Sequence, residues 1–478
     1  MKKNIVLLAM SVYGGRLQHN DFCIKETGEV VAEDCDGQLE PVIKMALKEF
    51  PGQKLEIIML CTDETLNNPS QVTGKTSVEY FKERVQGFSQ TAEVSFKEIP
   101  LDEDKPQDAI FKAVLYIRTI QSEIRTFWID THGGFRDVVL MMEAIVSLLK
   151  VEDIKPDRIW GVQFADKGRK YIVDQSEAYA LFDFVAGMNE FISYGSVRML
   201  NQYYLSHPQT ETEKNLLDAM KQVSDGLQDS DPEKYLNGLD LLGDMIGCIN
   251  EHNTFMLIFR EYLERSYGDL LDPEKRTVTG IIRRCLEKGF IMQALTFIEA
   301  LMPKEFVDHH IIEFNSEEVG IIKNNKQKNY KIDNWKSDEN FVVDRYVTSK
   351  YNNYFSTNGK AADLLNYIEA ELDRKATDTS KPKETFFQKK KGQFCSSIKL
   401  CLVRDQKNSE INLHTAVQEK DEKKAGRIMR LHKALKECRN KIVHCNSERP
   451  DTDSVKRLID LYLEKTEALF SIYPKTTG

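Results

Sequence analysis

Three side chains near the end of the chain have the types and spacing needed for chemistry on a phosphodiester. The segment CRNKIVHC, residues 438–445, contains Arg439, Asn440 and His444. A histidine can transfer a proton near neutral pH, and an arginine can stabilise the phosphorane formed when a ribose 2′-hydroxyl attacks the adjacent phosphate. The asparagine could orient either the histidine or the phosphate. These residue types therefore suit RNA cleavage that needs no metal ion.

The segment is predicted to be helical, which limits how these side chains can meet. Apolar residues recur at spacings of three and four, at Ile428, Leu431, Leu435, Cys438 and Ile442. This spacing indicates one buried helix face, so Cys438 is predicted to be core. Arg439 and His444 would diverge by about 140° around that helix, at about 100° per residue. Two copies facing each other across a twofold axis would bring the residues together more easily than one.

Two other interpretations of this region are weaker. Cys445 has no CxxC partner, so the pattern does not favour zinc, and we expect no metal ligand here. A second match to the same arginine and histidine spacing runs from Arg427 to His432, but no asparagine follows Arg427. We therefore predict a structural role for that pair.

A second candidate site follows two predicted strands in the first third of the chain. The strand at 4–10 leads into SVYGG, and the strand at 126–132 leads into a glycine turn and then a helix. Such strand ends expose backbone N–H groups and favour anionic ligands, and in an open α/β sheet they lie at the same edge. We expect one pocket formed by Ser11, Tyr13, Gly14, Thr131, His132, Gly133, Gly134 and Arg136.

The order of the predicted elements indicates two domains. Residues 1–200 alternate strands, at 4–10, 54–62, 92–99, 126–132 and 158–165, with helical patterns at 38–50, 77–88, 107–120 and 137–149. This alternation predicts a doubly wound, Rossmann-like α/β domain with a mostly parallel sheet. Residues 201–478 are predicted to be all-α, with a polar, lysine-rich insertion at about 315–393.

The GKT sequence at 74–76 resembles the end of a phosphate-binding loop. The pattern requires glycine where Pro69 stands, and proline supplies neither the backbone N–H nor the positive φ expected there. Thr76 and Glu79 have the spacing of a helix capping box instead. We therefore expect a helix to begin here.

Composition limits the possible classes of protein. The chain has 478 residues, a formal net charge of −9 and nine cysteines without a repeating interval. The negative charge argues against general electrostatic binding of nucleic acid, so any RNA contact must be local. The scattered cysteines are typical of reduced thiols in a cytoplasmic protein. No apolar run approaches the length of about 20 residues that spans a bilayer, so no membrane association is expected.

Together, RNKIVH at 439–444, DTHGGFRD at 130–137, SVYGG at 11–15 and GFIMQALTFIEALMP at 289–303 resemble the CRISPR-associated CARF-HEPN ancillary ribonucleases of type III systems. The resemblance covers nearly the whole chain outside the insertion. It implies a CARF domain at 1–200 that binds cyclic oligoadenylate across a dimer, and a HEPN endoribonuclease domain at 201–478. By position, Arg439, Asn440 and His444 match the catalytic motif, while Ser11 and the loop 131–136 fall where the ligand is bound.

The resemblance thus implies a cytoplasmic homodimer or higher homo-oligomer that cleaves single-stranded RNA in antiviral defence. No cofactor is expected; the allosteric activator is a cyclic oligoadenylate, with cyclic tetra-adenylate favoured over hexa-adenylate. A different class remains open, a nucleotide-sensing regulator whose helical domain binds a protein or DNA partner without catalysis. The combination of arginine, asparagine and histidine favours the enzyme, because a binding module has no need of it.

Overall fold

The structure is a computed structural model that describes residues 2–475, except 15–16, 18, 90–91, 135–136, 165–169, 208, 250–253, 315–387, 391–392, 403–406 and 444–449. The chain forms two compact units, Met1–Val185 and Ala186–Gly478. His444, Arg136 and most of the predicted insertion lie outside the described residues.

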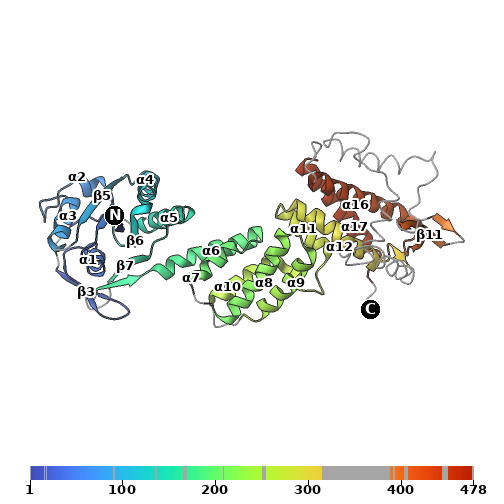
Figure 1. Cartoon of the computed structure of the whole chain (residues 1–478), viewed down its shortest axis with the longest axis horizontal. Helices are drawn as coiled ribbons and strands as arrows, with labels where there is room; N and C mark the ends of the chain where they lie inside the picture. The colour runs from blue at the N-terminus through green and yellow to red at the C-terminus, as the bar shows by residue number, and fades with distance from the viewer. Residues whose placement is uncertain are drawn as a thin grey trace. The chain divides into compact units, whose positions relative to one another are not determined.

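The first unit is built on an eight-stranded mixed sheet (Figure 1). The strands are β1 (Lys3–Ala9), β2 (Asn20–Ile24), β3 (Val30–Cys35), β4 (Leu55–Thr62), β5 (Val94–Leu101), β6 (Ile124–Asp130), β7 (Arg158–Phe164) and β8 (Lys170–Asp174). Their order across the sheet is β3-β2-β8-β7-β6-β1-β4-β5. The run from β7 to β5 is parallel, and β2 pairs parallel with β8. Only the pairs β2 with β3 and β7 with β8 are antiparallel among these strands.

Helices cover both faces of this sheet. They are α1 (Glu40–Glu49), α3 (Ser77–Phe88), α4 (Pro106–Thr119) and α5 (Val138–Val151), with the short α2 (Asp63–Asn67) before α3. Val6 and Leu8 of β1 pack in one core with α1 and α3, whereas Ile5 and Leu7 pack in the other core with α4 and α5. Because strand side chains alternate between faces, a strand buried on both sides is mostly apolar, as β1 is from residue 5 to residue 9. The predicted α/β architecture of this unit is confirmed.

The helix predicted after the GKT sequence is also confirmed. Thr76 is the N-cap of α3, and its hydroxyl oxygen accepts a hydrogen bond from Glu79 N at 3.2 Å. The Glu79 carboxylate accepts in return from Thr76 N at 3.0 Å. This reciprocal pair satisfies two backbone donors that a helix start leaves open. The stretch at 68–76 therefore ends at the N-cap of a helix, as the sequence indicated.

The second unit is mainly helical. After α6 (Ser176–Tyr194), which spans the division between the units, come α7 (Arg198–Ser206), α8 (Glu211–Gln228), α9 (Pro232–Gly247), α10 (Thr254–Tyr267), α11 (Val278–Glu287), α12 (Ile291–Asp308), α16 (Glu422–Val443) and α17 (Thr452–Phe470). The pair α8 and α9 packs closely, as do α11 with α12 and α16 with α17 (Figure 1). Cys438 of α16 is fully buried, so its predicted place in the core is confirmed.

The all-α expectation for the second half is incomplete, because this unit also contains an antiparallel sheet. Its order is β10-β11-β12-β9, formed by β9 (Glu313–Phe314), β10 (Gln388–Lys390), β11 (Gln393–Leu402) and β12 (Lys407–His414). Strands β11 and β12 lie beyond the predicted insertion, and they pair with each other over eight residues. Across the described part of the chain, none of the helices combines the length and apolar character needed to cross a bilayer.

Candidate functional site

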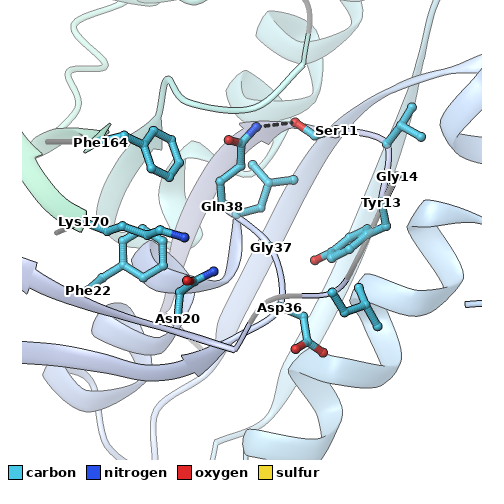
Figure 2. A pocket seen from close by; sticks show the side chains of 13 residues that line it. Ser11, Tyr13, Gly14, Asn20, Phe22, Asp36, Gly37, Gln38, Phe164 and Lys170 are labelled. Carbon is cyan, nitrogen blue, oxygen red and sulfur yellow. Dashed lines mark hydrogen bonds between the residues drawn. The ribbon is translucent and has the colours of Figure 1, made fainter. Parts of the chain in front are cut away.

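A cavity of about 280 Å³ lies in the first unit, next to the segment that follows β1 (Figure 2). Its wall is made by residues 11–14, by the turn 36–39 that precedes α1, and by Leu17, Asn20, Phe22, Phe164 and Lys170. The predicted residues Ser11, Tyr13 and Gly14 are therefore part of the wall. Parallel strands direct their carboxyl ends to this edge, which is where open α/β sheets bind ligands.

The two loops predicted to share a pocket are joined by hydrogen bonds at Ser11. Its hydroxyl oxygen accepts from Gly134 N at 2.8 Å and from Gln38 Nε2 at 3.3 Å. Gln38 Oε1 in turn lies 3.0 Å from Nε2 of His132. Both bonds at Ser11 use its lone pairs, so its own proton can be donated to a ligand oxygen. The structure thus brings Ser11, His132 and Gly134 together around Gln38, a residue that the sequence analysis missed.

None of the predicted residues 131–134 of the second loop lines the cavity, and their environments are those of structural residues next to it. Thr131 is buried, and its hydroxyl contacts Trp160 O at 3.1 Å and Gln175 Oε1 at 2.7 Å. A Cβ added to Gly133 would lie 1.8 Å from the carbonyl oxygen of Ala9, so glycine is required there by the approach of β1. Gly134 has a φ of +83°, which favours glycine for its backbone conformation.

Tyr13 lines the cavity, but its polar atoms are already engaged. Its backbone N donates to Ser77 Oγ at 3.0 Å, and its hydroxyl donates to Glu40 at 3.4 Å. The ring packs edge-on against Tyr80 at a centroid distance of 5.0 Å. Burial is the main cause that raises the pKa of Tyr13 well above its ordinary value, with the Glu40 carboxylate adding to it. The tyrosine hydroxyl therefore stays protonated and fixes the segment after β1 against α1 and α3.

Lysine and aromatic side chains complete the wall opposite Ser11. Nζ of Lys170 lies 5.4 Å from the ring centroid of Phe164 and 5.8 Å from that of Phe22, and Figure 2 shows it reaching across Phe22 toward Asn20. Rings of this kind stack on bases, and an ammonium attracts phosphate. Lys170 and Asn20 begin β8 and β2, two strands the sequence analysis did not find. The combination suits a nucleotide.

An uncommon carboxyl group lies under the loop. Asp130 ends β6, is completely buried, and accepts a hydrogen bond from His132 N at 3.0 Å through Oδ1. Burial raises the pKa of this carboxyl to about 7, and the bond from His132 offsets part of the effect. Burial likewise lowers the pKa of the His132 imidazole. Near neutral pH the His132 imidazole is therefore mostly neutral and the Asp130 carboxyl carries only part of a negative charge, which weakens the repulsion of an anion at the loop.

The second candidate site lies in the second unit, at the end of α16. Nη1 of Arg439 donates to Asn440 Oδ1 at 3.1 Å and lies 3.2 Å from Oε2 of Glu299 on α12. The Arg439 side chain is 33% exposed, so it remains accessible to a phosphate. His444, the third predicted residue, lies outside the described residues. The structure therefore describes two of the three residues, and Glu299 is a neighbour that the sequence analysis missed.

The competing histidine upstream has a structural environment. His432 is 2% exposed, and its Nδ1 lies 3.0 Å from the hydroxyl of Tyr462 on α17. Its ring also packs edge-on against Phe306. A histidine in this position cannot reach RNA without unfolding of the surrounding helices. This burial agrees with the structural role predicted for the pair Arg427 and His432.

The chain matches no known protein-family profile and no curated protein. Among solved structures, one similar chain is Csm6 from Enterococcus italicus bound to cyclic hexa-2′-fluoro-hexa-dAMP. The two sequences are 12% identical, with a TM-score of 0.39 over 100% of this chain and 96% of that chain. A similarity this distant carries no argument about function, so the proposal below depends on the residues themselves.

Proposed function

We propose that the protein is a metal-independent endoribonuclease for single-stranded RNA that is activated by a cyclic oligoadenylate. The N-terminal unit would be the CARF sensor and the C-terminal unit the HEPN nuclease, acting in type III CRISPR defence. The observation that carries the proposal is a cavity lined by Ser11 and Gln38, two residues that the loop 132–134 contacts by hydrogen bonds without itself lining the cavity. The motif resemblance supplies the ligand class, and the cavity supplies a place that suits it.

The chemistry of the cavity fits one nucleotide of such a ring. Phe22 and Phe164 offer faces for an adenine, and Lys170 offers a charge for a phosphate. At about 280 Å³ the cavity is near the lower limit of about 300 Å³ for ligand pockets. A ring of several nucleotides therefore needs more than one cavity. Two protomers related by a twofold axis would supply equivalent contacts to a symmetric ring.

Cleavage would use the residues at the end of α16. In the proposed reaction His444 takes the proton of the ribose 2′-hydroxyl, whose oxygen attacks the adjacent phosphorus. The 5′-oxygen of the next nucleotide leaves and takes a proton from water, and His444 then returns its proton to water. Arg439 would stabilise the phosphorane, with Asn440 and Glu299 fixing the orientation of its guanidinium. The products would carry 2′,3′-cyclic phosphate and 5′-hydroxyl ends.

The test is an RNA cleavage assay in EDTA, with the full chain and a panel of cyclic tri-, tetra- and hexa-adenylate. We expect one ring size to stimulate cleavage and a linear oligoadenylate of the same length to be much weaker. The 3′ ends of the products should resist ligation until the cyclic phosphate is opened and the resulting monophosphate is removed. If a cyclic oligoadenylate binds but no RNA is cleaved, the protein would instead be a nucleotide-sensing regulator without catalysis. If no cyclic oligoadenylate binds, the proposed sensor function is wrong.

A further inference from the structure

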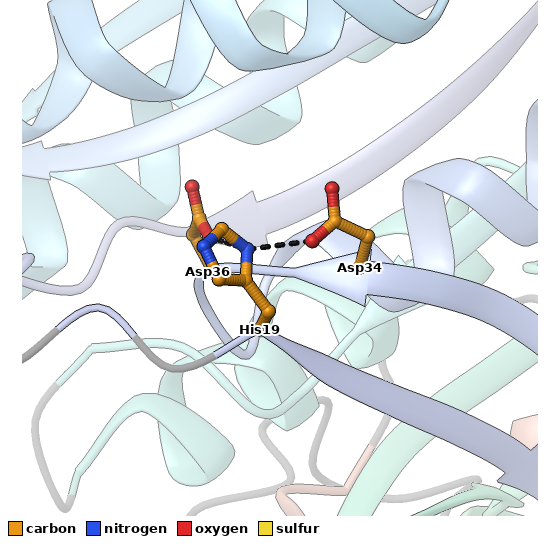
Figure 3. Close-up of side chains that lie close together, drawn as sticks. All are labelled: His19, Asp34 and Asp36. Atoms are coloured by element: carbon orange, nitrogen blue, oxygen red, sulfur yellow. Dashed lines mark ion pairs between the residues drawn. The ribbon is translucent and has the colours of Figure 1, made fainter.

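Three side chains with metal-binding atoms meet at the ends of β2 and β3 (Figure 3). Nδ1 of His19 lies 2.5 Å from Oδ1 of Asp34 and 3.0 Å from Oδ1 of Asp36. All three atoms lie within 4.8 Å of one another. One nitrogen and two carboxylate oxygens are therefore close enough to one another to bind one ion. His19 precedes Asp34 by 15 residues in the chain, and Asp36 follows Asp34 by two.

The histidine does not have enough protons to donate a hydrogen bond to both carboxylates. An imidazole nitrogen carries at most one proton, so Nδ1 can donate to only one of the two carboxylates. The Asp36 side chain is only 3% exposed, and no hydrogen bond reaches its Oδ1 from the described residues. A buried carboxylate oxygen without a donor is costly, and a missing ion is one of its ordinary explanations.

The Asp36 carboxylate and the backbone of Asp34 are held in place by other residues. Oδ2 of Asp36 accepts from the Tyr80 hydroxyl at 2.7 Å and lies 3.1 Å from Nε of Arg84. The backbone carbonyl of Asp34 accepts from Lys44 at 2.9 Å and from Arg84 at 2.7 Å. Asp34 also has a φ of +54°, a conformation that aspartate tolerates better than most residues. Such support of the ligands, from residues that do not touch the ion, is typical of metal sites.

The local charge also favours a cation. Arg84 is paired with the buried Glu40, at 3.0 Å from Nη2, and Lys44 lies 3.9 Å from the same carboxylate. Arg84 and Lys44 thus supply two positive charges, against three negative charges from Asp34, Asp36 and Glu40. If His19 is neutral, these five charged side chains and the histidine have a net charge of −1. Oδ1 of Asp36, which no hydrogen bond reaches from the part of the chain that the structure describes, faces the histidine.

We propose that His19, Asp34 and Asp36 bind a divalent first-row transition-metal ion, with Zn²⁺ the best fit. Zinc takes histidine nitrogen and carboxylate oxygen at about 2.0–2.2 Å, and sites with three protein ligands leave a position for water or a ligand. Mg²⁺ and Ca²⁺ prefer shells made of oxygen alone, so the histidine selects against them. Because Asp36 also lines the cavity, the ion lies at the edge of the candidate ligand pocket.

Isothermal titration of the chelator-treated full chain with Zn²⁺ tests this site. We expect one ion per chain, with affinity reduced at least tenfold in His19→Ala and in Asp34→Asn. Glu33→Gln and His207→Ala are matched controls, an exposed neighbouring carboxylate and a histidine in the other unit, and both should bind as the wild type does. An excess of Mg²⁺ or Ca²⁺ should not compete.

Co²⁺ provides a second readout, because its spectrum reports the ligands. Nitrogen and oxygen ligands give weak visible bands, whereas cysteine thiolates add intense near-ultraviolet absorption. The wild type should show the weak bands alone, and His19→Ala should lose them. Zinc binding that survives in His19→Ala, thiolate absorption, or no ion bound by the wild type would each overturn the proposal. None of these measurements uses nucleotide or RNA, so their result is independent of the proposed function.

Discussion

Oε2 of Glu299 lies 3.2 Å from Nη1 of Arg439, and its other oxygen lies 3.4 Å from Nζ of Lys436. One carboxylate of α12 therefore holds two cations of α16. The Glu299 side chain is 28% exposed, so water screens this pair only in part. The contact with Arg439 is an ion pair in which no hydrogen bond reaches Oε2 of Glu299 from the described residues. It attracts the guanidinium toward α12 in the absence of RNA, which would make Glu299 a positioning residue in the proposed reaction.

Glu299→Gln should slow cleavage without preventing RNA binding. The amide keeps the size of the side chain but removes the charge between Arg439 and Lys436, so the guanidinium can leave its productive orientation. We expect kcat to fall about tenfold with KM changed by less than about twofold. Steady-state cleavage rates over a range of RNA concentrations measure both. A lower melting temperature with unchanged kcat per folded molecule would show that Glu299 serves only the packing of α12 and α16.

Arg439→Ala and His444→Ala should each abolish most of the cleavage. Loss of a positioned acid-base group typically costs about 10²–10⁴ in rate. Arg457→Ala is the matched control, since this arginine is exposed on α17. Activator binding should be unchanged in all three variants. Cleavage that persists in His444→Ala would mean that the wrong histidine has been chosen.

The variant His432→Ala distinguishes a loss of stability from a loss of catalysis. Its contacts with Tyr462 and Phe306 would be lost in His432→Ala, which should lower stability by about 1–3 kcal/mol. The fraction that remains folded should cleave at the wild-type rate. The measurement is kcat per folded molecule, with the folded fraction taken from circular dichroism at the assay temperature.

The strands of the eight-stranded sheet in the first unit show which elements could be predicted from the sequence. Five strands were predicted within a few residues, and the clearest of them, β1 and β4, contain long apolar runs that are buried on both faces. The three missed strands, β2, β3 and β8, are short and mix apolar with charged residues. They are stable only through pairing with distant partners, which local periodicity does not record.

This omission also explains why part of the cavity wall was missed. Asn20, Phe22 and Lys170 lie on β2 and β8, so their meeting with Ser11 depends on sheet order. The glycine turn was found from the sequence, but the role of Gly133 was not. The expectation was a backbone N–H for the ligand, whereas the structure places this residue against the carbonyl of Ala9. Substitution of Gly133 would therefore disturb β1 and is a poor test of ligand binding.

Lys170→Met is a cleaner test of the cavity. It removes the positive charge that faces the aromatic rings while keeping the length of the side chain. A charge-assisted contact contributes about 1.5–3 kcal/mol, so the activator concentration for half-maximal cleavage should rise at least about tenfold. Lys112→Met, at an exposed position of α4, is the control. If the wild type and Lys170→Met have equal affinity for the activator, the phosphates of the activator do not bind next to Lys170.

The proposed metal ion should be coupled to the proposed activator, a prediction that depends on both proposals. A bound Zn²⁺ would offset the charges of Asp34 and Asp36 beside the cavity and favour an anionic ligand. Couplings of about 1–3 kcal/mol are common, so activator affinity should rise about tenfold or more with zinc. The activator must then raise zinc affinity by the same factor. Calorimetry in both orders checks this equality, and His19→Ala should show no coupling.

Asp130 predicts the pH dependence of stability. Its pKa is about 7 in the folded state against an ordinary value of 3.8, because burial disfavours the charged carboxylate. Between about pH 4 and pH 7 the folded chain thus holds a proton that the unfolded chain has lost, so stability falls as pH rises, by at most about 1.4 kcal/mol per pH unit. Asp130→Asn imitates the protonated form and keeps the acceptor for His132 N. Urea midpoints of both proteins at pH 5, 6, 7 and 8 measure the effect. The stability of Asp130→Asn relative to the wild type should change most between pH 5 and pH 7, where the variant gains, and should level off above pH 7. An equal difference in stability at every pH would show that Asp130 is not the group that titrates.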